Sequence, residues 1–218
     1  MVFARARLNM VEGQLRPNGV SDPRVLAAML ALPREACLPA AQRARAYVDA
    51  DVAVAPGRWL IEPMVLARLV QAAEPRTSDR ALVIAAGAGY GAAVLARLVG
   101  AVVALEAPDR LPFLRAGLAA LGANGVAAVA GPVVDGWPAE QPYDLVLIDG
   151  GVEEVPEPVL AQLAEGGRLV TVETSGRSGI LGRAVRWLRA GGVATRLELF
   201  DAGTPLLPEF RRPRRFVF

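Results

Sequence analysis

The 218-residue sequence contains no histidine and no lysine, so all 24 of its basic residues are arginine. These absences exclude catalytic triads with a histidine base, histidine metal sites, Schiff-base lysines and the P-loop lysine. We therefore expect no metal site. The single cysteine, Cys37, has no partner for an internal disulfide, and we expect it to be a small core residue. A chain without disulfides suits a reducing compartment, and we predict a cytoplasmic protein.

Long apolar runs and strong net charge are also missing. The N-terminal residues 1–7 lack the apolar segment of a signal peptide, and the most hydropathic window, 81–96, is shorter than the ~20 residues of a membrane span. We therefore expect no membrane association. A net charge of +2 argues against nucleic acid as a partner. With 53% apolar residues, we expect one globular domain over 1–218, in which a helical N-terminal segment (1–75) precedes the sheet (76–218).

The most informative stretch is Ala81 to Glu106. A short apolar run, Leu82 to Ile84, gives way to small residues and glycines through Ala92, after which apolar residues recur at helical spacing. A second apolar run ends at Glu106, nineteen positions after Gly87. Glycines let a ligand approach the backbone, the helix N-terminus offers free N–H groups, and an acid at the next strand end accepts ribose hydroxyls. The spacing predicts a nucleoside-cofactor site, although it also satisfies the G-x-G-x-x-[GA] pattern of nicotinamide enzymes.

Further strands and helices alternate along the chain, as in a doubly wound sheet. The predicted helices follow Asp22-Pro23, open at Pro63, and cover 111–121, 157–163 and 181–188, while 47–61 reads as loops and short strands. The predicted strands after Glu106 are 127–129, 145–148, 169–172, 194–200 and 216–218. The last two suggest an antiparallel pair at the sheet edge, which favours a methyltransferase over a nicotinamide enzyme. We predict an α/β fold with a Rossmann-like, doubly wound, seven-stranded mixed sheet and an N-terminal helical extension.

The chain resembles protein-L-isoaspartate O-methyltransferases up to about Val172. The matching pieces are Met10-Val11, Gln14-Leu15, Gly19-Val20, Val25-Leu26, Ala28-Met29, Pro33-Arg34, Ala46-Tyr47, Asp49, Pro63, Gly87 to Tyr90, Glu106, Pro142 to Asp144, Pro156, Gln162-Leu163 and Gly166 to Leu169. The resemblance implies a class I fold that binds S-adenosylmethionine and a protein or peptide acceptor, with the helical segment 1–75 covering the acceptor side and the sheet 76–218 binding the cofactor. It does not indicate an oligomeric state.

Three departures from the family pattern fall at working positions. Ile61 stands where the family has a serine, Ala85 stands where it has the first turn glycine, and Gly131-Pro132-Val133 replaces Gly-Asp-Gly and so lacks the acid that reaches the adenine. The C-terminal residues 205–218 also differ from the usual family ending. A carboxylate acceptor is already ionised at neutral pH and needs no general base, so a chain without histidine can still methylate one.

The resemblance and the spacing together give the site residues. For the cofactor we predict Ala85, Ala86, Gly87, Gly89, Tyr90, Glu106, Val133 and Asp149. Catalytic roles stay unassigned without the family serine; Glu62, beside the vacated position, and Asp149, at the end of the fourth strand, are the candidates. The leading hypothesis is a methyltransferase of the isoaspartyl-repair type. A different acceptor, a non-catalytic binding module and nicotinamide binding are the alternatives.

Overall fold

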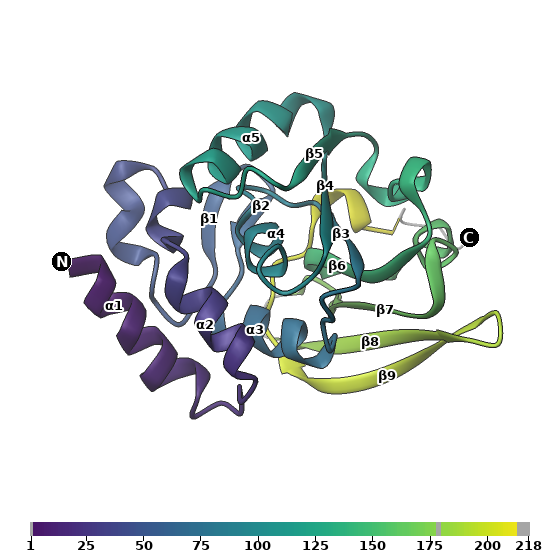
Figure 1. Cartoon of the computed structure of the whole chain (residues 1–218), viewed down its shortest axis with the longest axis horizontal. Coiled ribbons are helices and arrows are strands. Elements are labelled where there is room, and N and C mark those ends of the chain that lie inside the picture. The colour runs from purple at the N-terminus through teal and green to yellow at the C-terminus, as the bar shows by residue number, and fades with distance from the viewer. Residues whose placement is uncertain (1, 178–179, 213–218) are drawn as a thin grey trace.

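The structure is a computed structural model, and it describes residues 2–177 and 180–212 (Figure 1). Six α-helices are present in this part of the chain: α1 (Val2–Met10), α2 (Pro23–Ala31), α3 (Pro63–Ala72), α4 (Tyr90–Leu95), α5 (Leu111–Ala120) and α6 (Glu157–Leu160). The strands are β1 (Val52–Ala55), β2 (Arg58–Leu60), β3 (Arg80–Ile84), β4 (Ala101–Glu106), β5 (Ala127–Ala130), β6 (Tyr143–Val152), β7 (Leu163–Glu173), β8 (Gly182–Ala190) and β9 (Val193–Ala202). A π-helix, Val11–Leu15, and several short 3-10 turns complete the described elements.

A seven-stranded mixed sheet in the order β5-β4-β3-β6-β7-β8-β9 forms the centre of the fold. The first five strands in this order are parallel, and β8 is antiparallel to both of its neighbours. This arrangement confirms the predicted doubly wound, mixed sheet. The chain turns from β3 toward β4 on one side and resumes at β6 on the other, so the carboxyl ends of β3 and β6 flank the switch point where such sheets bind ligands.

The edge of the sheet differs from the prediction. Residues 181–188 are predicted as a helix, but from Gly182 onward they belong to β8, which pairs with β7 on one side and β9 on the other. Over so short a run, its apolar residues fit both the helical period of 3.6 and the strand period of 2. Strand pairing on both sides therefore decides the conformation. The antiparallel pair is therefore β8 and β9, and the predicted strand 216–218 lies outside the described residues. The helix predicted over 157–163 ends at Leu160, and β7 begins at Leu163.

The two faces of the sheet are covered unequally. On one face, Val83 and Ala104 belong to a large apolar core that includes residues of α2, α3, α4 and α5. On the other face, a smaller core is completed by α6 and by Leu207 and Phe210 of the C-terminal segment. The chain beyond β9 thus supplies part of the cover for the carboxyl end of the sheet.

The N-terminal segment gathers on one side of the molecule (Figure 1). Helix α2 begins as predicted: the Asp22 side chain accepts a hydrogen bond from the Arg24 N–H at 2.8 Å, and Pro23 occupies the first turn. Pro63 likewise occupies the first turn of α3, although the preceding Glu62 makes no side-chain cap hydrogen bond. Between these helices, β1 and β2 form a separate antiparallel hairpin, in agreement with the short strands predicted for 47–61.

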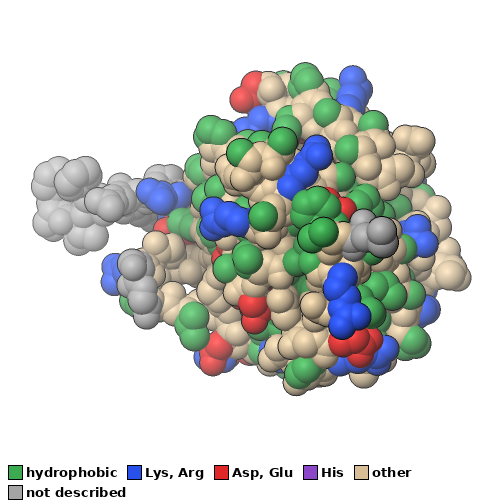
Figure 2. Space-filling view, turned by 90° about the vertical axis from the view of Figure 1, so that its left-hand side faces the viewer, with side chains coloured by type: hydrophobic (Ala, Val, Ile, Leu, Met, Phe, Trp, Pro, Cys, Tyr) green, Lys and Arg blue, Asp and Glu red, His purple; other side chains and the backbone are tan. Residues whose placement is uncertain are grey.

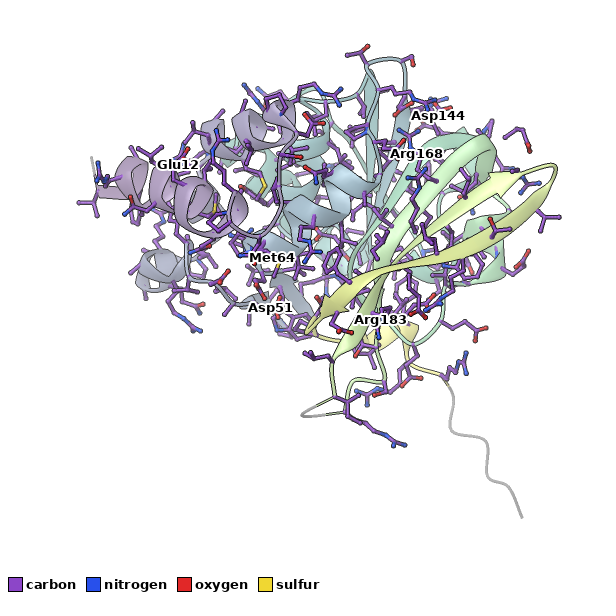
Figure 3. All side chains as sticks on the ribbon, turned by 90° about the horizontal axis from the view of Figure 1, so that it is seen from below. Glu12, Asp51, Met64, Asp144, Arg168 and Arg183 are labelled. Carbon is purple, nitrogen blue, oxygen red and sulfur yellow. The ribbon has the colours of Figure 1, made fainter. Side chains whose placement is uncertain are left out.

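A buried ion pair lies at the opposite end of the sheet from the switch point. Arg168, at the start of its strand pairing with β6, forms an ion pair with Asp79, and its Nη1 donates to the Asp144 carbonyl oxygen at 2.9 Å. Figure 3 shows Arg168 beside Asp144, far along the sheet from Asp51 and Arg183. Both side chains of the ion pair are almost fully buried.

The described surface shows no concentration of one charge on the face formed by the N-terminal segment. Figure 2 shows basic side chains there dispersed among apolar and acidic ones. Among the described residues, no helix combines the length and apolar character required to cross a bilayer.

Candidate functional site

The glycine turn connects β3 to α4. Ala85, Gly87 and Gly89 all have positive φ, at 56°, 55° and 82°, and the Gly89 N–H donates to the Ala86 carbonyl oxygen at 2.7 Å. A Cβ on Gly89 would lie 2.7 Å from Leu118 Cδ2 of α5, so this glycine is also required for helix packing. The turn therefore has the backbone form that the sequence predicts.

Glu106 lies at the end of β4, directly beside this turn. Its Oε2 accepts a hydrogen bond from the Gly87 N–H at 2.9 Å, across the nineteen positions that separate them in sequence. Residues Ile84 and Leu105 pair in register, which brings the ends of β3 and β4 together. The carboxylate is fully buried.

Arg58 of β2 covers the carboxylate of Glu106. Its Nε donates to Oε2 at 2.8 Å and its Nη2 donates to Oε1 at 2.7 Å, a bidentate pair, and Oε1 also accepts from the Ala107 N–H at 2.8 Å. The carboxylate thus accepts two N–H groups on each oxygen. Because a carboxylate offers about four lone-pair sites, its acceptor capacity is used by the protein itself.

Glu209 of the C-terminal segment holds the outer side of Arg58. Glu209 Oε1 accepts from Arg58 Nη2 at 2.9 Å, its Oε2 accepts from Nη1 at 3.1 Å, and Arg110 Nη1 also donates to Oε1 at 3.0 Å. Burial opposes ionisation of Glu209, but the two guanidinium groups lower the pKa of this carboxyl. Burial lowers the pKa of Arg58, but hydrogen bonds and attraction to the Glu106 and Glu209 carboxylates raise it by more, so the net change is an increase. Arg58 is therefore a charged side chain, 1% exposed, between two acids.

The C-terminal segment is fixed to the end of β6. The Gly151 N–H donates to the Pro205 carbonyl oxygen at 2.9 Å, and the Leu207 N–H donates to the Gly151 carbonyl oxygen at 2.8 Å. Leu207 is fully buried, and a Cβ on Gly150 would lie 2.6 Å from its Cγ. Sequence reasoning missed both Arg58 and Glu209; an arginine in a short hairpin and an acid 151 positions later give no local signal.

The remaining predicted cofactor residues line the same turn or the core behind it. Ala85 and Ala86 are buried, and the Ala86 N–H donates to the Leu105 carbonyl oxygen at 3.2 Å. Val133 is 2% exposed and packs in the smaller core beneath the C-terminal segment. Tyr90 is buried at the start of α4. These positions surround the glycine turn, and their roles toward a cofactor stay predictions.

Asp149 faces α4 from the end of β6. It is 8% exposed, and a Cβ on Gly91 would lie 2.7 Å from its Oδ2. Burial raises the pKa of Asp149 to about 7; the Arg34 and Arg58 guanidinium groups oppose this increase, and the Glu106 carboxylate adds to it. Asp149 therefore changes charge near neutral pH.

Arg34 is a fully buried arginine that lies over the Tyr90 ring at the start of α4. Its Nε donates to the Ala46 carbonyl oxygen at 2.8 Å, its Nη2 donates to the Ile61 carbonyl oxygen, and its guanidinium lies 4.9 Å from the centre of the Tyr90 ring. Within the described chain, Arg34 Nη1 and the Tyr90 hydroxyl have no hydrogen-bond partner. Desolvation lowers the pKa of Arg34. Arg34 Nη1 and the Tyr90 hydroxyl are thus buried polar groups whose hydrogen-bonding capacity the described residues leave unused.

Glu62 belongs to an acidic group at the start of α3. Its backbone N–H donates to Asp51 Oδ1 at 2.8 Å. Burial, followed by repulsion from Asp49 and Asp51, raises the pKa of Glu62 to about 7, and burial raises that of Asp51 to about 6. The side chain thus interacts with neighbouring acids.

The model of the protein-L-isoaspartate(D-aspartate) O-methyltransferase family matches residues 6–184. The chain belongs to this family. A protein-L-isoaspartate O-methyltransferase of Methanoculleus marisnigri is 40% identical over 167 residues, which cover 76% of each chain. Another, of Rhodopseudomonas palustris, is 44% identical over 162 residues, or 74% of each chain. The family match includes Arg58 and Glu106 but ends before Glu209.

Solved structures of the family share the fold. One protein-L-isoaspartate O-methyltransferase superimposes with a TM-score of 0.80 at 25% identity, covering 94% of this chain and 67% of the other. A Plasmodium falciparum family protein, solved in complex with S-adenosyl-L-homocysteine, gives a TM-score of 0.74 at 18% identity and covers 93% of this chain and 98% of its own. The family fold therefore extends over most of the present chain.

Proposed function

We propose that this family member is an S-adenosylmethionine-dependent methyltransferase that forms methyl esters on isoaspartyl carboxylates of proteins or peptides. Family membership supports the reaction class. The observation that carries the cofactor assignment is the hydrogen bond between the Gly87 N–H and Glu106, which places an acid beside the glycine turn at the switch point of the sheet. The single buried cysteine agrees with action in the cytoplasm.

The side chains around the turn are of the kinds that hold an adenosyl group, but their arrangement in this structure does not fit one. Ribose hydroxyls bind by donating to the strand-end acid, and every acceptor position of Glu106 already receives a protein N–H. The same carboxylate is closed to solvent. In this conformation Glu106 therefore has no free acceptor position for the ribose of a cofactor.

The acceptor side offers a reason for a carboxylate substrate. Ile61 has no polar side-chain atom, so it makes no hydrogen bond to an acceptor. Arg34 instead keeps its Nη1 amino group without a partner among the described residues, and a buried guanidinium with no carboxylate partner there favours an anionic ligand. Within this proposal, Arg34 orients the acceptor carboxylate and Tyr90 supplies a second polar contact.

Calorimetry with S-adenosylmethionine and S-adenosylhomocysteine tests the cofactor assignment directly. A transfer assay with tritiated cofactor, on an isoaspartyl peptide and on the same peptide with normal aspartate, then tests the acceptor. We expect label in an alkali-labile ester on the isoaspartyl peptide alone. Transfer to the isoaspartyl peptide only after Ile61→Ser would assign the natural chain a different acceptor, and absence of cofactor binding at millimolar ligand would refute the proposal.

A second candidate, favoured by the closed carboxylate of Glu106, is a binding module that keeps the sheet without the reaction. Copurified cofactor would exclude this candidate. So would methyl transfer to any protein in a proteome-wide labelling experiment, because a binding module produces no methylated product.

A further inference from the structure

We propose that Arg58 occupies the ribose position at Glu106 and sets the cofactor affinity of this chain, so that a nucleoside binds only when Arg58 leaves. This inference rests on the proposed function, because it concerns the same cofactor. The guanidinium and a pair of ribose hydroxyls are alternative donors to one carboxylate. Since that carboxylate is saturated by four N–H groups, the two partners compete for it.

Two of the four N–H groups belong to the cofactor motif itself and stay in place with either partner. The Gly87 and Ala107 N–H groups come from the backbone at the ends of the two strands. The other two come from Arg58, on a hairpin outside the strand-turn-helix unit. Removing the Arg58 donors therefore frees one lone-pair site on each carboxylate oxygen while leaving the motif intact.

The C-terminal segment keeps Arg58 in the closed position. Glu209 accepts from both Nη atoms of Arg58, and the Gly57 carbonyl oxygen accepts from Nη1 at 2.7 Å. Pro208 lies against the hairpin turn, because a Cβ on Gly57 would be 2.9 Å from Pro208 Cγ. Movement of Arg58 away from Glu106 thus requires rearrangement of the hairpin and of residues 207–210 together.

Space for that rearrangement exists on the outer side of Glu209. A hollow of about 680 Å³ is lined there by Val134, Leu160, Phe210 and Glu209 itself. Glu209 therefore separates this hollow from Arg58 and the glycine turn. The segment that carries Glu209 lies beyond residues 6–184, the part of the chain that matches the family, so the outer contact is a feature of this chain beyond the family match.

The test measures S-adenosylhomocysteine affinity by calorimetry for the full chain and three variants. Arg58→Met keeps an unbranched apolar stem and removes the guanidinium donors, and Glu209→Gln keeps Arg58 but removes the charge that holds it. Arg168→Met is the matched control, because it breaks a buried arginine-carboxylate pair at the other end of the sheet. We expect R58M to bind about tenfold tighter than the natural chain or more, E209Q to lie between them, and R168M to match the natural chain.

A second measurement uses only the natural chain, so it tests the proposal even if R58M does not fold. Hydrogen exchange of residues 204–210 in the natural chain is compared with and without S-adenosylhomocysteine, and we expect ligand to increase exchange there because it displaces the Arg58–Glu209 contact. Equal affinities for the natural chain and E209Q, with unchanged exchange on ligand binding, would overturn the role of Arg58 and leave the proposed function standing. No binding by any folded variant, R58M included, would overturn both.

Discussion

Replacement of Asp149 by asparagine makes a quantitative test of the electrostatics of the site. Burial raises the pKa of this carboxyl to about 7 from an ordinary value of 3.8. A folded-state pKa above the unfolded value means that the contribution of the group is fully present below about pH 4 and is lost as pH rises through about 7. Asparagine keeps the shape of the neutral acid and does not titrate.

The magnitude follows from the shift. Between about pH 4 and pH 7 the natural chain should lose about 1.4 kcal/mol of unfolding free energy per pH unit through this group, for a total of up to about 4 kcal/mol. The unfolding free energy of D149N relative to the natural chain should therefore rise across this range and stay constant above about pH 7.5. Contributions from Glu62 and Asp51, whose pKa values are also raised, cancel in the difference.

Urea unfolding at half-unit steps from pH 4.5 to 8.5 measures this difference. Asp109→Asn, which removes one carboxylate at an exposed position, is the control for the loss of a single acidic side chain. The groups that act on Asp149 are the Arg34, Arg58 and Glu106 side chains and the Gly91 backbone N–H, so mutation of any of the three side chains should move the midpoint. If the D149N and natural curves run parallel from pH 4.5 to 8.5, Asp149 ionises in the fold as it does in water, and the reasoning from burial is wrong.

Three further predictions concern stability, each read from chemical denaturation. Arg168→Met should destabilise by about 3–5 kcal/mol, because it leaves the buried Asp79 without its cationic partner; a loss below about 1 kcal/mol would mean that water solvates this acid. Gly117→Ala should cost about 3 kcal/mol, since its Cβ would lie 2.1 Å from a backbone oxygen of the glycine turn, whereas the open Gly125→Ala should be near neutral. Ala85→Gly should stabilise by up to about 1 kcal/mol by relieving a positive φ, and a loss of stability would contradict that strain.

The parts of the fold that sequence reasoning predicted correctly are those where local pattern and tertiary role agree. Apolar runs buried on both faces gave the parallel strands, and the glycines between Ile84 and Tyr90 gave the turn. The helix predicted for residues 181–188 was wrong because a nine-residue strand with only part of its residues buried carries no clear period of 2 or 3.6. Only its pairing with β7 and β9 decides its conformation, and that pairing is not local.

The site was likewise predictable where it depends on local pattern and not where it depends on contacts between distant segments. The position of Glu106 follows from strand register, which the apolar pattern specifies. The side-chain donors to Glu106 do not follow from strand register. Arg58 lies in a hairpin 48 positions before Glu106, and Glu209, which holds it, lies 151 positions after Arg58. In sequence each of these residues is indistinguishable from a solvated surface charge.

A buried acid at the end of the second core strand specifies hydrogen-bond donors but not the molecule that carries them. Two ribose hydroxyls and one bidentate guanidinium satisfy the same pair of oxygens, so the glycine turn and the spacing to Glu106 are compatible with an open site and with a closed one. The residue that decides between them lies at position 58, outside the unit that defines the motif. In this chain it is an arginine with a second acid behind it, and the closed state follows from those two side chains.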